Sequence, residues 1–422
     1  MNRALEPEVS LPDNITFLQP EKIQLANGIP AYLICAGEQE VVKLEVVFNA
    51  GVWYGDYALV ASAVNSLLQA GTKSKTAFEL SQAFDQYGAY LQTEVSLDIA
   101  VVRLFTLTKF VPETFPLLLE IIQESVFPKN EIDLFQEQGI QQLRINNQRV
   151  EYTARGLFSK ALFPGNHHYG RIIEESDYLC LNPSLITDWH NCYYTPDNCF
   201  LVLSGLFTQK EVEVLNNVFG RWTVGKEVQR KDTASLDEAY QAVEKHVEKQ
   251  DAVQTAIRIG CRAPNKLDED YVPLMVLTTI LGGYFGSRLM RNLREEKGYT
   301  YGVGCSLVSH IRGGYLVIST QVGKPYLADS LAQINLEINN LKDQLVKDEE
   351  LSLVKNYLSG VFLRSLDGTM AVSDRLKSVV VYGQTMDFYK DYLQKVKNTN
   401  SCELQSLALK YFNSKMTCIT VG

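Results

Sequence analysis

An arginine and a tyrosine seven residues apart are the best placed for chemistry in this 422-residue sequence. Arg294 stands near the end of a short basic segment, and Tyr301 follows after Lys297 and Gly298. A guanidinium and a phenol held side by side can bind a carboxylate or stabilise an oxygen on which negative charge develops. The pair therefore predicts a clamp for such a group. A plainer interpretation stays open, an arginine on a solvated helix end and a tyrosine in a half-buried strand.

Two elements must position this pair. The spacing of Leu289 and Leu293 predicts a helix over Gly286–Lys297. Gly298 is expected to end that helix, because glycine tolerates the left-handed conformation that follows many helices. From Tyr299 the apolar pattern changes to period two, which predicts a strand over Tyr299–Leu307.

Gly282 and Gly283 precede the basic segment and invite comparison with a phosphate-binding loop. No Gly-Lys-Ser/Thr follows them, and a predicted helix rather than a strand comes before them, so the context for a phosphate loop fails. A turn that breaks the helix accounts for them. They would also let a peptide backbone approach closely, although ordinary turn geometry is an alternative.

Composition limits the classes of function. The hydrophobic share of 46% and the charged share of 21% are those of an ordinary globular protein. Net charge is −9 and no run of Lys or Arg is present, which argues against nucleic-acid binding. The sequence shows no apolar span of membrane length and no signal peptide at its start. The eight cysteines are scattered, so we expect reduced thiols in a cytoplasmic protein without membrane attachment.

Histidine and serine chemistry have weak support. No two of the five histidines have the i, i+4 spacing of a helical metal site, and no G-x-S-x-G occurs. His167 and His168 are expected at the surface, because they lie in a polar loop. His190, Cys192 and Cys199 could form a soft-metal site, but their spacing is also that of an ordinary core.

The order of predicted strands and helices repeats after about 215 residues. EIDLFQEQGIQQLR, from Glu131, resembles ELSLVKNYLSGVFLR, from Glu350. The segment from Ala154 resembles the segment from Ser373, and PDNCFLVLSG resembles the chain's last residues, SKMTCITVG. The sequence therefore predicts two copies of one α/β module of about 200 residues.

The expected division of the chain follows from this repeat. We expect an N-terminal arm over 1–20, a first module over 21–215, a linker over 216–250 and a second module over 251–422. The stretch Gly225–Glu244 is charged and weakly periodic, which is typical of a linker.

The duplicated module, the opening LANGIPAYLI…VVFNAG and the motif SRLMRNLREEKGYTYGV together resemble the M16 zinc peptidases. That family includes pitrilysin, mitochondrial processing peptidase and the smaller bacterial M16B proteins. The resemblance covers nearly the whole chain from about Glu21. It implies an α+β fold of two tandem homologous modules, each a mainly antiparallel sheet covered by helices, which together form a clam-shell.

The resemblance also shows what is missing. Active members carry H-x-x-E-H on the first long helix, shortly before a Gly-Thr that is present here as Gly71-Thr72. A third ligand, a glutamate, lies on a later helix. The matching positions in this chain are Ser62, Asn65, Ser66 and Gln142. Serine hydroxyls are poor zinc ligands, and an asparagine cannot take a proton from water. We therefore expect no metal, no cofactor and no peptide hydrolysis in this chain alone.

The resemblance gives the arginine and tyrosine a role. Their equivalents in the family bind the substrate backbone and stabilise the oxyanion opposite the zinc, sometimes from a separate subunit. The expected substrate-binding residues are Arg294, Tyr301, Gly282 and Gly283. The expected partners are a zinc-bearing sibling with H-x-x-E-H and an unfolded peptide substrate.

Two alternatives to this function remain. The chain could be a stand-alone peptide-binding or scaffold protein, possibly a homodimer, with no role in proteolysis. It could also be a self-sufficient metalloenzyme that uses His190 and nearby cysteines.

Overall fold

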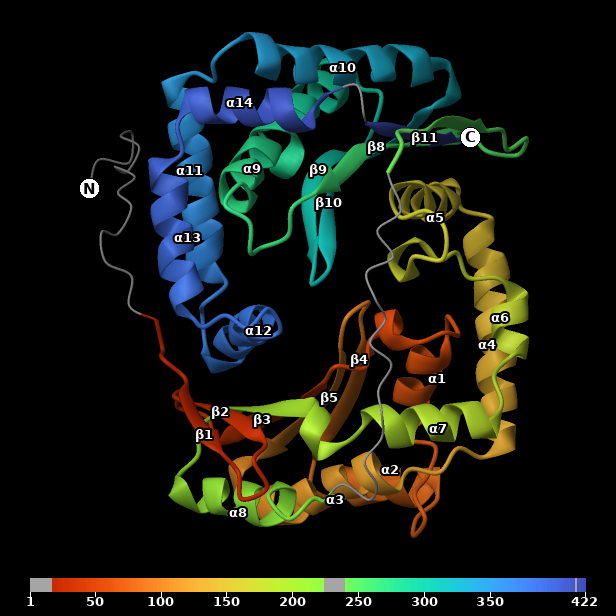
Figure 1. Cartoon of the computed structure of the whole chain (residues 1–422), viewed down its shortest axis with the longest axis vertical. Helices are drawn as coiled ribbons and strands as arrows, with labels where there is room; N and C mark the ends of the chain where they lie inside the picture. The colour runs from red at the N-terminus through yellow and green to blue at the C-terminus, as the bar shows by residue number, and fades with distance from the viewer. Residues whose placement is uncertain (1–16, 224–239, 414–415) are drawn as a thin grey trace.

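Each half of the chain builds one β-sheet, and the two sheets lie in opposite halves of the molecule (Figure 1). The computed structural model describes residues 17–223, 240–413 and 416–422. The first sheet has the order β1-β2-β6-β3-β5-β4 and the second has the order β7-β11-β8-β10-β9. The strands of the first sheet are β1 (Glu21–Gln24), β2 (Pro30–Cys35), β3 (Val41–Phe48), β4 (Tyr90–Val95), β5 (Ala100–Leu107) and β6 (Cys199–Gly205). Those of the second are β7 (Glu244–Val247), β8 (Gln254–Ala263), β9 (Val303–His310), β10 (Gly313–Gly323) and β11 (Thr417–Val421).

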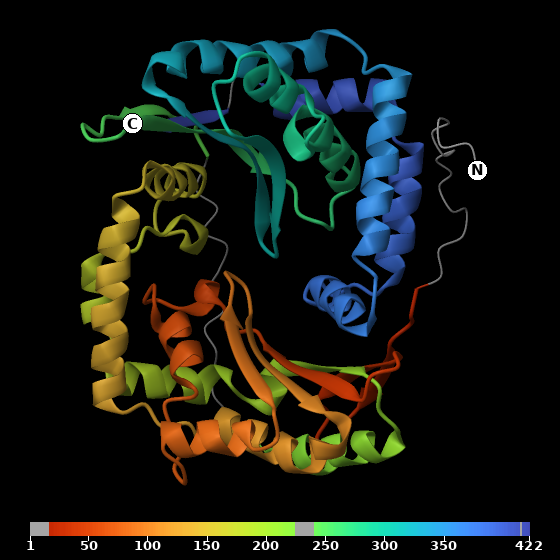
Figure 2. The same cartoon turned by 180° about the vertical axis from the view of Figure 1, so that it is seen from behind.

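Helices cover both sheets (Figures 1 and 2). In the first half they are α1 (Val60–Leu67), α2 (Ala77–Asp85), α3 (Val111–Glu124), α4 (Lys129–Asn147), α5 (Val150–Leu162), α6 (Glu175–Leu179), α7 (Pro183–Tyr193) and α8 (Gln209–Phe219). In the second half they are α9 (Tyr271–Thr278), α10 (Leu327–Asp343), α11 (Asp348–Arg364), α12 (Thr369–Val380), α13 (Asp387–Asn398) and α14 (Ser401–Tyr411). Two further helical segments, η5 (Thr279–Gly283) and η6 (Met290–Glu296), have the wider π-helical turn.

The two sheets repeat each other strand for strand. In both, one parallel pair (β2 with β6, β7 with β11) is followed by antiparallel pairs across the rest of the sheet. Strand β1 is an addition at the edge of the first sheet. The predicted fold class, two tandem α/β modules with mainly antiparallel sheets, is confirmed.

The register of the strands identifies equivalent residues in the two sheets. Strand β6 ends at Gly205, and the chain ends at Gly422 directly after β11. Glu45 of β3 lies opposite Val202, three residues before Gly205. Arg258 of β8 lies opposite Ile419, three residues before Gly422. Glu45 and Arg258 therefore occupy the same position in the two sheets.

One helix from each half crosses to the sheet of the other half. Helix α5 packs its Ala154 and Phe158 against Val317 and Ile419 of the second sheet. Helix α12 lies on β2 and β6 of the first sheet. The segments from Ala154 and from Ser373, which are similar in sequence, thus belong to two helices that each pack on the sheet of the other half. We call the sheet side that receives the exchanged helix its inner face.

Charged residues of β3 and β8 point to the inner faces of their sheets. On β3, Val42, Leu44 and Val46 point into the core of the first half. The intervening Lys43 and Glu45 point to the inner face, as the period of two requires. Arg103 lies opposite Glu45, and Ser319 lies opposite Arg258.

The predicted arm and linker fall partly outside the described residues. Residues 1–16 of the arm and 224–239 of the linker belong to the part of the chain on which the structure gives no description. The beginning of the predicted linker completes α8, and Glu244–Val247 near its end forms strand β7 of the second sheet.

Candidate functional site

The segment around Arg294 is helical as predicted, although the helix starts two residues after Gly286. It is helical over 288–296, and Gly298 follows with a φ of 66°, in the left-handed region. The amide of Tyr299 donates to the Leu293 carbonyl at 2.9 Å, which closes the last turn. The predicted helix end is therefore confirmed.

The strand predicted from Tyr299 is wrong at its start, since β9 begins at Val303. Thr300 is the reason. Its hydroxyl accepts from the Gly302 amide at 3.1 Å, donates to the Gly302 carbonyl at 2.9 Å and meets the Thr320 hydroxyl at 2.9 Å. These bonds fold residues 300–302 into a turn beside β10 instead of pairing them with it. Tyr301 is therefore presented by a turn and not by a strand.

Arg294 and Tyr301 both face solvent. Tyr301 is 91% exposed. The Arg294 guanidinium lies 4.8 Å from the ring centre of Phe285, which is itself exposed. Within the described residues, neither side chain makes a hydrogen bond or an ion pair, and no contact joins the two. Their use as one clamp stays a prediction.

Gly282 and Gly283 differ in their surroundings. Gly282 is buried in the π-helical turn after α9, and a Cβ there would lie 2.5 Å from the backbone nitrogen of Cys305. Its lack of a side chain thus lets this turn pack on β9. Gly283 is exposed, and a Cβ at that position would meet only the side chain of Thr279, at 3.1 Å. Contact of either glycine with a peptide stays a prediction.

Helix α1 carries three of the positions matched to the zinc motif. Asn65 is buried, and its amide donates to the hydroxyl of Tyr194 at 3.0 Å. Burial raises the pKa of that tyrosine, although the bond from Asn65 lowers it somewhat. Ser62 is half-buried and Ser66 is exposed. Asn65 is therefore part of a hydrogen-bonded core.

The fourth position lies on α4. Gln142 is exposed, and its amide donates to the Asn146 side chain one turn later at 3.1 Å. No histidine, cysteine or carboxylate stands at any of the four positions. Within 17–223, 240–413 and 416–422, no group of three or more such side chains is placed to hold a metal ion.

The prediction that His167 and His168 lie at the surface is wrong. Both are buried, because their loop packs its rings against Trp53. His190 is buried too, and one ring nitrogen lies 2.8 Å from the Ile122 carbonyl. Burial lowers the pKa of His190 to about 4, so this ring is neutral and built into the core near pH 7.

Comparison with known proteins places this geometry in a family. Residues 181–358, which include Arg294 and Tyr301, match the family model of the peptidase M16 inactive domain. An uncharacterized zinc protease, YmxG of Bacillus subtilis, is 25% identical over 307 residues, or 72% of this chain and 74% of that protein. A solved peptidase M16 inactive domain from Pseudomonas fluorescens matches with a TM-score of 0.86, 21% identity and coverage of 96% and 98%. The matched segment is that of the M16 peptidase family, and the fold of the whole chain is that of M16-like structures.

One M16-like structure is about twice as long as this chain. The periplasmic protease PqqL of Escherichia coli matches with a TM-score of 0.78 and 14% identity over 99% of this chain, but over only 47% of its own. The fold of this chain thus corresponds to about half of that protein.

The zinc of active M16 members does not fit the residues present in this chain. The positions offer two hydroxyls and two amides, and the Asn65 amide is held by Tyr194. Zinc in proteins takes thiolate, imidazole or carboxylate ligands, and its catalytic form needs three of them. We derive no step through zinc bound to this chain.

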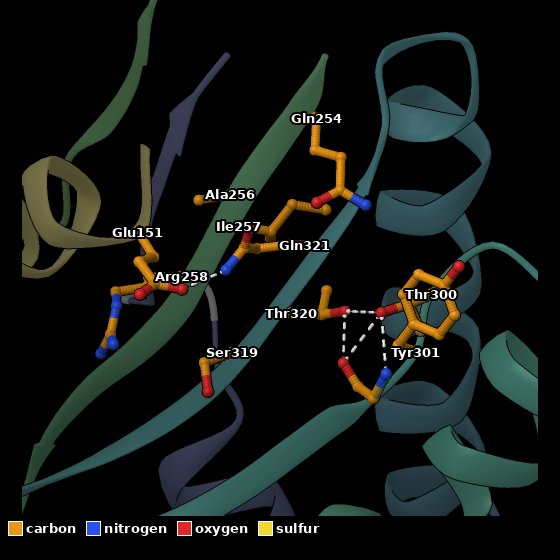
Figure 3. A pocket seen from close by; sticks show the side chains of 11 residues that line it. Glu151, Gln254, Ala256, Ile257, Arg258, Thr300, Tyr301, Ser319, Thr320 and Gln321 are labelled. Carbon is orange, nitrogen blue, oxygen red and sulfur yellow. Dashed lines mark hydrogen bonds between the residues drawn. The ribbon is translucent and has the colours of Figure 1, made fainter. Parts of the chain in front are cut away.

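A cavity that the sequence did not reveal lies beside Tyr301 (Figure 3). Its volume is about 370 Å³. It is lined by Glu151, Gln254, Ala256, Ile257, Arg258, Thr300, Tyr301, Gly302, Ser319, Thr320 and Gln321. Arg258 is one of two arginines in a largely apolar strand, and its neighbours come from distant segments, so no local pattern marks it.

In the described part of this chain, no helix is both long enough and apolar enough to cross a membrane.

Proposed function

We propose that this chain is a proteolytically inactive M16 subunit that acts with a zinc-bearing sibling in a heterodimeric metalloendopeptidase. It supplies Arg294 and Tyr301, which bind the substrate backbone and stabilise the oxyanion, together with half of the peptide chamber. The sibling carries H-x-x-E-H and the zinc. The substrate is an unfolded peptide.

The exposure of Arg294 and Tyr301 carries this proposal. Tyr301 is exposed and makes no hydrogen bond among the described residues, and Arg294 stacks on the exposed ring of Phe285. Both side chains therefore contribute little to the stability of the fold. Both remain available to donate to an oxygen brought by another molecule. The donors of an oxyanion site have this property, because they must be unpaired before the substrate arrives.

The state of α1 supports the division of labour. Asn65 stands where the family has its catalytic glutamate, and it is held by Tyr194 in the core. A chain with this helix and with a free Arg/Tyr pair fits a subunit that completes another chain's zinc centre. The match of this fold to about half of PqqL is consistent with a second half of similar size.

Reconstitution with an H-x-x-E-H-bearing M16 sibling tests the proposal. We expect the purified pair to cleave an unfolded peptide and each subunit alone to be inactive. Arg294→Ala and Tyr301→Phe should each lower kcat about 10²-fold to 10³-fold, the usual loss for an oxyanion donor.

Arg291→Ala is the matched control, because Arg291 is an exposed arginine of the same helical segment. It should keep the wild-type rate. Unchanged cleavage by the Arg294→Ala and Tyr301→Phe pairs would contradict the assigned roles. Peptide binding without any cleavage in the presence of siblings would favour the stand-alone scaffold.

A further inference from the structure

The strongest unassigned feature is the half-buried guanidinium of Arg258 in the cavity beside Tyr301 (Figure 3). Within the described residues, Arg258 makes no hydrogen bond and no ion pair. Burial lowers the pKa of Arg258 and the neighbouring Arg155 lowers it further, whereas Tyr315 and Glu151 raise it. An arginine stays charged even so, which leaves a cation here without an ion pair among the described residues.

The equivalent position in the first sheet shows what a completed site looks like. Glu45 is fully buried, and its carboxylate lies 2.8 Å from the guanidinium of Arg103 and 2.6 Å from the ammonium of Lys377. Lys43 lies 3.2 Å away. The inner face of the first sheet therefore satisfies its buried charge, while that of the second sheet does not.

Ser319 explains the difference. It stands opposite Arg258, at the position that Arg103 occupies opposite Glu45. A serine gives no counter-charge. The carboxylate that lies nearest on the exchanged helix, Glu151, already accepts a hydrogen bond from Gln321. Arg258 and Arg155 together outweigh that single negative charge, so the cavity favours an anion.

The shape of the cavity suits an extended chain. It adjoins a second hollow of about 540 Å³, and the two share Glu151, Gln254 and Gln321. The second hollow continues to Val253, which is 86% exposed, and to Arg149. Amide side chains line the shared part. Such groups can pair with a peptide backbone, whose donors and acceptors alternate.

We propose that Arg258 binds a carboxylate of an extended peptide lying in these two hollows, either an Asp or Glu side chain or the free C-terminus. This inference deepens the proposed function and rests on it, since it makes the peptide that reaches Arg294 and Tyr301 an acidic one. Gln254, Gln321 and Ser319 hold the peptide next to the carboxylate.

Binding of peptides that carry an uncharged fluorophore to the isolated chain tests the inference without any proteolysis. The probe is a short alternating Ala-Ser peptide in three versions. One has a free C-terminal carboxylate, one a C-terminal amide with a central Glu, and one a C-terminal amide with a central Gln. At low salt, fluorescence anisotropy should show roughly tenfold tighter binding for at least one carboxylate version than for the neutral version. The preferred version identifies the source of the carboxylate.

Two variants test whether Arg258 causes this preference. Arg258→Gln should remove the difference between charged and neutral peptides. Ser319→Asp places a carboxylate opposite the guanidinium, as in the first sheet, and should also remove it. Ser319→Asp should raise the thermal midpoint at the same time, because it supplies the missing ion pair. Loss of the carboxylate preference together with higher stability cannot be due to misfolding.

Arg144→Gln is the matched control, because Arg144 is an exposed arginine on α4 that is paired with Glu175. It should bind peptides as the wild type does. Equal binding of all three peptides by the wild type, no binding at all, or an undiminished preference in Arg258→Gln would each overturn the inference. Arg294→Ala should keep the carboxylate preference, so failure of the protease proposal and failure of this one give different results.

Discussion

The two modules share one sheet topology but differ in whether the polar residues at key positions are paired. In the first module, Glu45 is buried among Lys43, Arg103 and Lys377, and Asn65 is bonded to Tyr194. In the second module, Arg258 lacks an ion pair within the described residues, and Tyr301 is almost fully exposed. Glu45 and Asn65 thus stabilise the fold, whereas Arg258 and Tyr301 are available to a ligand.

This difference shows how two copies of one module can serve different purposes, one stabilising the fold and the other binding a ligand. Removing a polar residue that is paired internally lowers the stability of the fold, and such a residue is not available to bind a ligand. One that is left unpaired adds nothing to stability and can be changed with little effect on the fold. The comparison therefore predicts large losses of stability from substitutions at Glu45 and Asn65 and a small one at Arg258.

Glu45→Gln should have the largest effect on stability. It leaves Lys43 and Lys377 with the exposed Asp374 as their carboxylate and Arg103 with Glu94. Removing one member of a buried ion-pair network costs about 3–5 kcal/mol. Denaturant unfolding should show this loss, and a loss below about 1 kcal/mol would contradict the assigned role of the network.

Acid should act on the same group. Burial alone would raise the pKa of Glu45, but Lys377 and Lys43 lower it from 4.5 to about 2. A carboxylate whose pKa is lower in the folded state stabilises the fold above the unfolded pKa and loses this contribution as the pH falls. Between about pH 4.5 and 2, wild-type protein should lose about 3 kcal/mol that Glu45→Gln does not lose. Parallel pH profiles of the two proteins would disprove this.

Asn65→Ala should have an intermediate effect. It leaves the buried hydroxyl of Tyr194 without its described donor, at a cost of about 1–3 kcal/mol in the free energy of unfolding. Ser66→Ala is the control, since Ser66 is exposed on the same helix and should cost less than about 0.5 kcal/mol. Equal effects of the two changes would mean that Asn65 has no structural role.

Arg258→Gln should have the smallest effect on stability. A cation with no ion pair contributes little, so we expect a change below about 0.5 kcal/mol in the free energy of unfolding. The same glutamine substitution at Glu45, the equivalent position, serves as the comparison. A loss at Arg258 as large as that at Glu45 would remove the distinction between the two sheets.

The fold could be predicted largely from the sequence because it depends on repeated apolar patterns. The spacing of Leu289 and Leu293 predicts a helix, and residues 288–296 are helical. The similarity between the segments from Ala154 and Ser373 is visible in the sequence alone. That both helices exchange sheets could not be seen, because the pattern shows an apolar face but not which sheet it meets.

The site was harder to predict, since its details depend on contacts between distant segments. Period two around Tyr299 and Tyr301 indicated a strand, yet the Thr300 hydroxyl bonds turn the chain there. His167 and His168 looked like polar loop residues, but Trp53 covers them. That Arg258 lacks the counter-charge found at the equivalent Glu45 depends on the registers of the two sheets, which the sequence does not show.

The exchange of α5 and α12 has a consequence for synthesis of the chain on the ribosome. The first sheet is complete at Gly205, but the helix that covers its inner face ends only at Val380. Until then Glu45 lacks Lys377, and the apolar Ile34 and Val202 lack their cover. Domains commonly fold in order from the N-terminus. A nascent chain that contains the first module alone, however, still exposes the inner face of its sheet. Both modules must leave the ribosome before either can reach its final stability.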